Sequence, residues 1–119
     1  MILGVGTDMV SKARIAAVLA AHGEKFISRI LNAYEQTELE KRSDKVAYLA
    51  KRFAAKEAIA KALGCGLGAR LSFQDITISN LPSGAPTAEI LRQPFRTCRI
   101  HLSLSDEKEH ALAFAVAED

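Results

Sequence analysis

The chain has 119 residues, of which 49% are hydrophobic and 25% are charged. This composition fits one compact globular domain and excludes two domains or a disordered chain. Sixteen Lys and Arg against 14 Asp and Glu give a net charge of +2, which is too small to indicate nucleic acid as a partner. The charge is uneven, with +4 over residues 1–61 and −2 over residues 62–119, so the first half suits an acidic partner.

Neither a membrane segment nor a disulfide framework is expected. The longest apolar runs have seven residues, far short of the roughly 20 that span a bilayer. Cys65 and Cys98 lack the spacing of a CxxC motif or a metal site, so we interpret them as reduced thiols. The N-terminus has no signal-peptide pattern, and we therefore expect a cytoplasmic protein.

The chain opens with a predicted strand over residues 2–7. This segment is apolar and partly β-branched, and Gly4 and Gly6 indicate that another backbone approaches it closely. Ser11 then has the position of a helix N-cap, and apolar residues follow at helical spacing until Gly23, which suits the position after a helix. The order strand, then helix, is the first fixed point of the fold.

Two further helices are predicted in the first half. A short one covers residues 24–31, where apolar side chains form one stripe, and a polar stretch without a predicted element follows at residues 35–42. Asp44 then caps the longest periodic segment, which runs to Leu63 and is closed by Gly64.

After this helix the apolar period changes from 3.6 to 2, which predicts strands. Turn residues separate them at 80–84 and 106–109. The whole chain, residues 1–119, is therefore expected to form a single α+β domain in which the long helix packs on an antiparallel meander. The predicted strands are 71–79, 87–91, 99–105 and 110–117.

Glu57 lies beside the apolar stripe of the long helix and has two interpretations. It precedes Lys61 by four residues, the favoured orientation for an ordinary exposed ion pair. Alternatively, Glu57 is a metal ligand, and Lys61 neutralises a phosphate. Asp8 has a similar ambiguity, because an Asp after a strand is often a turn or cap residue. Two carboxylates from different elements are also what Mg²⁺ needs when substrate phosphates complete its shell.

The other candidate motifs give weaker indications of a functional site. The segment from Gly64 to Gly68 is rich in glycine but follows a helix instead of opening one, so it is not a P-loop. Gly64 is explained as the residue after the helix, although a flat ligand could lie on this backbone. The three histidines are scattered, which argues against zinc. Ser103 and Ser105 have no nearby His and Asp relay, so a serine hydrolase is unsupported.

Two motifs together resemble a known family. The first is Gly6-Thr7-Asp8 followed by Arg14, and the second is the string Arg52-Phe-Ala-Ala-Lys-Glu-Ala-Ile-Ala-Lys-Ala-Leu-Gly64. Both resemble the signature motifs of the holo-[acyl-carrier-protein] synthases, the short 4′-phosphopantetheinyl transferases. The likeness covers the whole chain, and the specificity of the second string favours the metal-site interpretation of Glu57.

The resemblance implies a fold, an assembly and a reaction. Members are homotrimers with an active site at each subunit interface, and they bind coenzyme A and Mg²⁺. A serine of apo acyl carrier protein attacks the coenzyme A β-phosphate and receives 4′-phosphopantetheine for fatty acid biosynthesis, and adenosine 3′,5′-bisphosphate is released. By this resemblance Asp8 and Glu57 bind the metal, Lys61 contacts the pyrophosphate, and Glu57 or a metal-bound water takes the serine proton.

The same resemblance assigns contacts to the two substrates. Residues that match the family's coenzyme A contacts are Arg52, Lys61, Gly64, Gly84 and Pro86. Residues expected to meet the acidic carrier protein are Arg14, Lys25 and Arg29. The alternative for the last three is an ordinary solvated face.

Some positions depart from the family pattern. Many members have histidine where this chain has Asp106, and His101 should face the other side of the strand. Asn32 replaces a hydroxyl residue, although either type caps a helix, and no lysine separates Gly84 from Pro86. Two other readings therefore stay open: a non-catalytic module that docks acidic proteins, and an acyl-thioester enzyme, which would leave the lysine and glutamate string unexplained.

Overall fold

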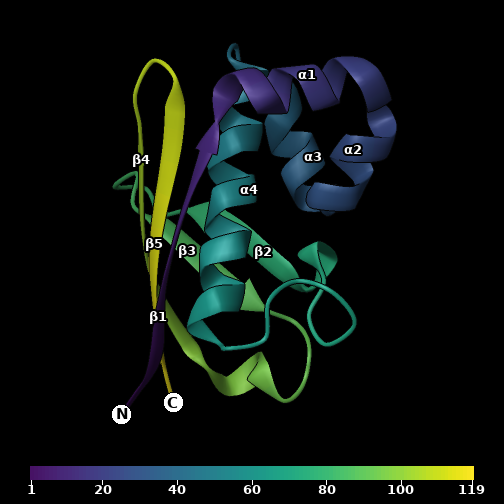
Figure 1. Ribbon diagram of the computed structural model, residues 1–119. Helices are drawn as coiled ribbons and strands as arrows, with labels where there is room; N and C mark the ends of the chain where they lie inside the picture. The colour runs from purple at the N-terminus through teal and green to yellow at the C-terminus, as the bar shows by residue number, and fades with distance from the viewer.

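The computed structural model describes residues 1–119 and has the predicted α+β architecture. The long helix α4 runs through the middle of the molecule, a sheet covers one side, and three shorter helices lie on the other (Figure 1). The elements in chain order are β1 (Ile2–Ser11), α1 (Lys12–His22), α2 (Glu24–Ile30), α3 (Ala33–Glu40), α4 (Lys45–Ala62), the 3-10 turn η1 (Phe73–Asp75), β2 (Ile76–Asn80), β3 (Pro86–Ile90), the 3-10 turn η2 (Phe95–Thr97), β4 (Arg99–Asp106) and β5 (His110–Glu118).

The strands form two separate antiparallel groups, so the prediction of one meander is wrong. The main sheet has the order β1-β5-β4, and β2 pairs only with β3. The N-terminal strand therefore lies against the C-terminal one, with Thr7 opposite Phe114. Local apolar periodicity identifies a strand but says nothing about which distant strand it meets, so this pairing was not predictable from the pattern.

Several local predictions are confirmed. The side chain of Ser11 accepts a hydrogen bond from the Arg14 backbone N–H and caps α1, and Asp44 caps α4 in the same way. Gly64 follows Leu63, the C-cap of α4, and has a positive φ of 74°, as expected for the position after a helix C-cap. The first strand, however, continues past the predicted end at Asp8 to Ser11.

The polar stretch predicted to be irregular contains helix α3. The Asn32 side chain accepts from the Glu35 backbone N–H at 3.1 Å, and the Glu35 carboxylate accepts from the Asn32 backbone N–H at 3.0 Å. This reciprocal capping box starts a helix that has almost no apolar periodicity. A second capping box, between Ser72 and Asp75, forms η1 and delays β2, so the strand predicted at 71–79 begins only at Ile76.

Small residues allow α4 to lie directly on the main sheet. A Cβ added to Gly4 would lie 2.2 Å from the Ala62 carbonyl oxygen, and one added to Gly6 would lie 2.0 Å from that of Ala58. The inward residues of β5 are all alanines and fully buried. The predicted close approach at the first strand is therefore confirmed, and it places Asp8 next to α4. No helix combines the length and apolarity needed to cross a bilayer.

This contact gives a stability prediction. We expect Gly6→Ala to lower the free energy of unfolding by about 3 kcal/mol or more, because the new methyl group meets helix backbone that has no room to move. Urea unfolding monitored by circular dichroism measures the loss. The matched control is Gly68→Ala, whose Cβ would meet no atom within 4 Å and whose effect should stay within about 0.5 kcal/mol. Equal stability of both variants would contradict the prediction.

Candidate functional site

Asp8, Glu57 and Lys61 meet where β1 lies against α4. The Lys61 ammonium donates to Asp8 Oδ1 at 3.2 Å and to the Thr7 carbonyl oxygen at 3.0 Å. The ordinary ion pair between Glu57 and Lys61, the alternative left open by the sequence, is not formed, because Lys61 reaches across to the strand instead. Side chains from β1 and α4 thus form one charged cluster, in which Asp8 and Lys61 are 53 positions apart in the chain.

The Glu57 carboxylate is partly buried and has no hydrogen-bond donor or cation in contact with it. Burial raises the pKa of Glu57, and the negative charge of Asp8 raises it further, while Lys61 and Arg14 lower it. The two carboxylates repel each other, and only Asp8 has a cation, Lys61, in contact with it.

This donor set fits a hard divalent cation. The structure holds no group of three or more His, Cys, Asp or Glu side chains arranged around one point, so a cation that demands a closed protein cage does not fit. Mg²⁺ commonly uses one or two carboxylates and completes its shell with water and substrate phosphates. Asp8 and Glu57 satisfy that requirement, and Lys61 adds a second positive charge for a phosphate.

A pocket of about 490 Å³ opens beside Glu57. Its walls come from α1, α2, α4 and η1, and it is lined by Arg14, Ile15, Val18, His22, Lys25, Phe26, Arg29, Ile30, Phe53, Glu57 and Phe73. The rings of Phe53 and Phe73 stack with centroids 5.5 Å apart and form part of the apolar lining. All three basic residues predicted to meet a carrier protein thus line the same pocket as the predicted metal ligand.

Arg52 lies in a second cluster on α4. Its side chain is only 4% exposed, yet no carboxylate pairs with it: Nη2 donates to Asn80 Oδ1 at 2.8 Å, and the guanidinium lies 4.5 Å from the centre of the Tyr48 ring. The buried Nε has no hydrogen-bond partner. A buried cation held only by neutral groups, with a free donor, is suited to an anionic ligand.

Asn80 connects this cluster to the turn that contains Gly84, one of the predicted coenzyme A contacts. Its Nδ2 donates to the Gly84 carbonyl oxygen at 3.0 Å, so Arg52 and Gly84, both predicted coenzyme A contacts, are joined through one side chain, and Pro86 begins β3 just beyond. Sequence reasoning missed Asn80 and Tyr48. In the sequence Asn80 is typical only of a turn, whereas Tyr48 precedes Arg52 by four residues on the predicted long helix, a spacing that could have indicated their contact.

The cluster around Lys61 and the cluster around Arg52 are not connected to each other within the chain. Arg52 and Lys61 are nine residues apart on α4, about 14 Å along the helix axis, and no hydrogen bond or ion pair links their neighbourhoods. Gly64 lies beyond the end of α4. The predicted coenzyme A contacts are therefore divided between separate places on the chain.

The position where many family members carry histidine has a different environment here. Asp106 accepts from Lys12 at 2.8 Å and lies 3.5 Å from Lys51, and these contacts, led by the hydrogen bond from Lys12, lower the pKa of Asp106. His101 lies opposite Val116 on the outer face of the sheet and pairs with Glu118 at 2.7 Å. It faces away from the side of Asp106, as the alternation predicts.

The outer face of the main sheet is uncovered and is apolar over β1 and β5, while β4 presents Arg99, His101, Ser103 and Ser105 on it. Side chains that alternate with the inward glycines and alanines point away from α4, and the large exposed ones among them are Leu3, Val5, Met9, Leu112 and Phe114. In a chain this small, a contiguous exposed apolar face indicates an interaction surface.

The comparisons with known proteins, by sequence and by structure, agree on one family. Residues 4–115 match the model described as the 4′-phosphopantetheinyl transferase superfamily. The chain is 48% identical over 126 residues to the holo-[acyl-carrier-protein] synthase of Marinomonas sp. (strain MWYL1), covering 99% of this chain and 98% of that protein. The crystal structure of the synthase from Neisseria meningitidis superposes with a TM-score of 0.91 at 42% identity, covering both chains completely. The synthase from Helicobacter pylori in complex with coenzyme A gives a TM-score of 0.87 at 34% identity, covering 96% of this chain and 99% of that one.

Proposed function

Because the chain belongs to the 4′-phosphopantetheinyl transferase superfamily, we infer that it is a holo-[acyl-carrier-protein] synthase. It transfers 4′-phosphopantetheine from coenzyme A to a serine of apo acyl carrier protein and so supplies holo carrier protein for fatty acid biosynthesis. The observation that carries this conclusion is the match to named synthases over the whole length of both chains, in sequence and in structure.

The reaction forms one bond and breaks one. The serine oxygen of the carrier protein attacks the β-phosphorus of coenzyme A, the bond from that phosphorus to the bridging oxygen breaks, and adenosine 3′,5′-bisphosphate leaves with the electron pair. Lys61 neutralises charge on the pyrophosphate. The Glu57 carboxylate, whose pKa is raised by burial, is suited to receive the serine proton. Asp8 and Glu57 would hold Mg²⁺, which supplies further charge neutralisation at the phosphates when bound.

Coenzyme A recognition is assigned to Arg52, Gly64, Gly84 and Pro86 in addition to Lys61. The support for Arg52 is that no carboxylate neutralises its guanidinium, which is held only by Asn80 and the Tyr48 ring, so its charge suits a ligand phosphate. The support for Gly84 is its hydrogen bond to Asn80, the same side chain that holds Arg52. Gly64 leaves the backbone after α4 free of a side chain, and nothing lies within 4 Å of the point where a Cβ would stand.

The pocket beside Glu57 is the proposed docking site of the acidic carrier protein. Arg14, Lys25 and Arg29 surround its opening, while aromatic and aliphatic side chains form its walls. Basic residues at the rim attract an acidic surface and orient it, and an apolar interior provides area for burial. The serine to be modified would thereby be brought to the side of the pocket where Glu57 lies.

The docking role of Arg14 gives a testable asymmetry. We expect Arg14→Glu to raise the KM for apo carrier protein by about tenfold or more, since one charge is reversed at the rim, and to change the KM for coenzyme A little. The matched control is Arg96→Glu, the same charge reversal on η2, which contributes nothing to the pocket. Steady-state kinetics with each substrate varied in turn measures both constants, and equal losses for the two substrates would argue against docking.

We also propose that the active protein is a homotrimer with active sites between subunits. The outer face of the β1-β5-β4 sheet presents five large exposed apolar residues that a second copy of the chain would cover. The division of the coenzyme A contacts between two places on one subunit supports a site completed by a neighbour.

The two cysteines agree with a cytoplasmic location. Cys65 and Cys98 are both free thiols in the structure, as expected from the sequence. Reduced cysteines are typical of cytosolic proteins, and we propose that compartment.

One assay tests the proposed activity. The protein is incubated with coenzyme A, Mg²⁺ and apo acyl carrier protein, and the carrier is then weighed by mass spectrometry. A gain of one phosphopantetheine group establishes the transferase. Binding of the carrier protein without a gain in mass would identify a non-catalytic docking module instead. If a separate incubation with an acyl thioester gives hydrolysis and no group transfer occurs, the protein is an acyl-thioester enzyme.

A further inference from the structure

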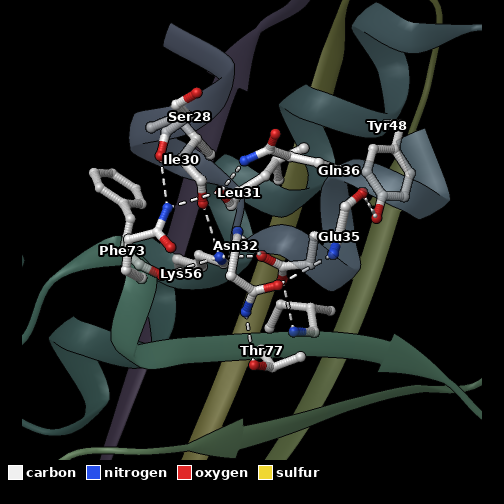
Figure 2. Close-up of polar contacts among 12 residues, drawn as sticks. Ser28, Ile30, Leu31, Asn32, Glu35, Gln36, Tyr48, Lys56, Phe73 and Thr77 are labelled. Carbon is white, nitrogen blue, oxygen red and sulfur yellow. Dashed lines mark hydrogen bonds and ion pairs between the residues drawn. The ribbon is translucent and has the colours of Figure 1, made fainter. Parts of the chain in front are cut away.

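A fully buried ion pair joins α4 to α3 (Figure 2). Lys56 on α4 and Glu35 on α3 are both completely inaccessible to solvent, and Lys56 Nζ donates to Glu35 Oε1 at 2.6 Å. Removing two charges from water is costly, and well-packed apolar residues often serve stability as well or better. The pair therefore calls for a role beyond holding the core together.

The Lys56 ammonium uses all three of its donors. Besides Glu35 it donates to the Ile30 carbonyl oxygen at 2.8 Å and to the Phe73 carbonyl oxygen at 3.0 Å. Ile30 is the last residue of α2, and Phe73 is the first residue of η1. One atom of α4 thus fixes the end of α2 and the start of η1 at the same point.

Glu35 extends this junction to two more elements. Its Oε1 also accepts from the Asn32 backbone N–H, which closes the capping box of α3, and its Oε2 accepts from the Ile78 backbone N–H of β2 at 2.8 Å. Gln74 strengthens the same region, since its Nε2 donates to the Ser28 and Leu31 carbonyl oxygens at 2.6 and 2.7 Å. No polar side-chain atom of the buried pair is left without a partner.

The two carbonyl groups held by Lys56 belong to residues that line the docking pocket. Ile30 and Phe73 are part of its wall, and Glu57, also in the wall, is the next residue after Lys56 on α4. Three of the four elements that form the pocket, α2, η1 and α4, therefore meet at Lys56 Nζ. The fourth, α1, carries Arg14 and is joined to α2 through Gly23.

We propose that Lys56, held by Glu35, is a positioning residue for carrier-protein docking: it fixes the α2 and Phe73 walls of the pocket relative to Glu57. An apolar side chain of similar length would fill the space, but it would leave the carbonyl groups of Ile30 and Phe73 without a donor and release the end of α2. The inference rests on the proposed function, because the pocket is taken to be where the carrier protein binds.

The test compares Lys56→Met with Leu49→Ala, a matched control on the same helix. Leu49 is fully buried and does not line the pocket, so its truncation destabilises the core without touching the junction. With both proteins folded, we expect Lys56→Met to raise the KM for apo carrier protein by roughly tenfold to 100-fold, with less than about a twofold change in the KM for coenzyme A. Leu49→Ala should leave both constants near those of the unaltered protein.

A folded Lys56→Met protein with an unaltered KM for the carrier would overturn the proposal, as would an equal rise in both KM values. If Lys56→Met does not fold, Glu35→Gln carries the test. This change keeps an acceptor oxygen for Lys56 but removes the acceptor of the Ile78 N–H, so the same constant should rise by a smaller factor.

A readout without substrates separates this proposal from the proposed function. Amide hydrogen exchange over residues 24–30 should be faster in Lys56→Met than in Leu49→Ala, because α2 loses the donor that holds its last carbonyl group. If the unaltered protein fails to modify carrier protein, the proposed function fails, while faster exchange still supports Lys56 as the group that positions α2. Unchanged exchange over these residues would count against it.

Discussion

Replacing Glu57 by glutamine is expected to abolish phosphopantetheine transfer, a loss of about 100-fold or more in kcat/KM, and to make the metal-free protein more stable. The loss follows from removing one of the two carboxylates that would hold Mg²⁺ and the proposed acceptor of the serine proton. The gain follows from the raised pKa of Glu57, which burial and the charge of Asp8 together produce.

The sign of the stability change is set by proton binding. A carboxyl group whose pKa is higher in the folded than in the unfolded protein binds more protons when folded, so the free energy of unfolding decreases as pH rises through that interval. Above that interval the metal-free protein therefore carries an unfavourable charge at Glu57. Glutamine removes that charge while keeping the shape of the side chain, and the stability of the variant should depend less on pH between the two pKa values.

Thermal unfolding with and without Mg²⁺ measures both effects. The unaltered protein should gain stability from Mg²⁺, because a cation that binds only the folded state stabilises it by mass action, and the gain should shrink as pH falls and Glu57 becomes protonated. Glu57→Gln should start from a higher midpoint and show little response to the cation. Glu89→Gln, on an exposed position of β3, is the control, and retained transfer by Glu57→Gln would refute the metal assignment.

The parts of the fold that depend on neighbouring residues were predictable. Ser11 and Asp44 cap helices because each side chain accepts a hydrogen bond from a backbone N–H only three residues later. The long apolar period of α4 is enough to predict a helix. Gly4 and Gly6 in an apolar strand correctly indicated the close approach of another backbone. The caps and the helix depend on residues within one turn, whereas the two glycines indicate that a backbone lies close without indicating which one.

The parts that depend on distant residues were not predictable from pattern. Glu35 looks like a surface residue in a polar stretch, yet its carboxylate is fully buried because Lys56, 21 positions later, lies opposite it. The pairing of β1 with β5 joins the two ends of the chain in the same way. Arg52 was singled out by motif alone, while the features that suit it to an anion, burial without a carboxylate, exist only in the folded structure.

Introducing a charge on the outer face of the sheet is expected to dissociate the proposed trimer and to remove activity at the same time. Phe114 lies in the central strand β5, between Thr7 on one side and Ser103 on the other, and is 46% exposed in the single chain. In a trimer that buries this face, Phe114→Asp would bury a carboxylate between the neutral side chains of Thr7 and Ser103, which costs several kcal/mol for each site. Sedimentation should show three times the chain mass of 12.9 kDa for the unaltered protein and one chain mass for the variant.

The control distinguishes a loss of assembly from a loss of fold. Tyr34→Asp changes an aromatic residue of almost equal exposure, 48%, on α3 and away from the sheet, so it should leave mass and activity unchanged. Circular dichroism of Phe114→Asp should resemble that of the unaltered protein, because its side chain makes no contribution to the buried core. An active monomer would refute the requirement for a neighbouring subunit. A folded, inactive monomer would mean that a subunit with Asp8, Glu57 and Lys61 all in place still needs its neighbour to bind coenzyme A.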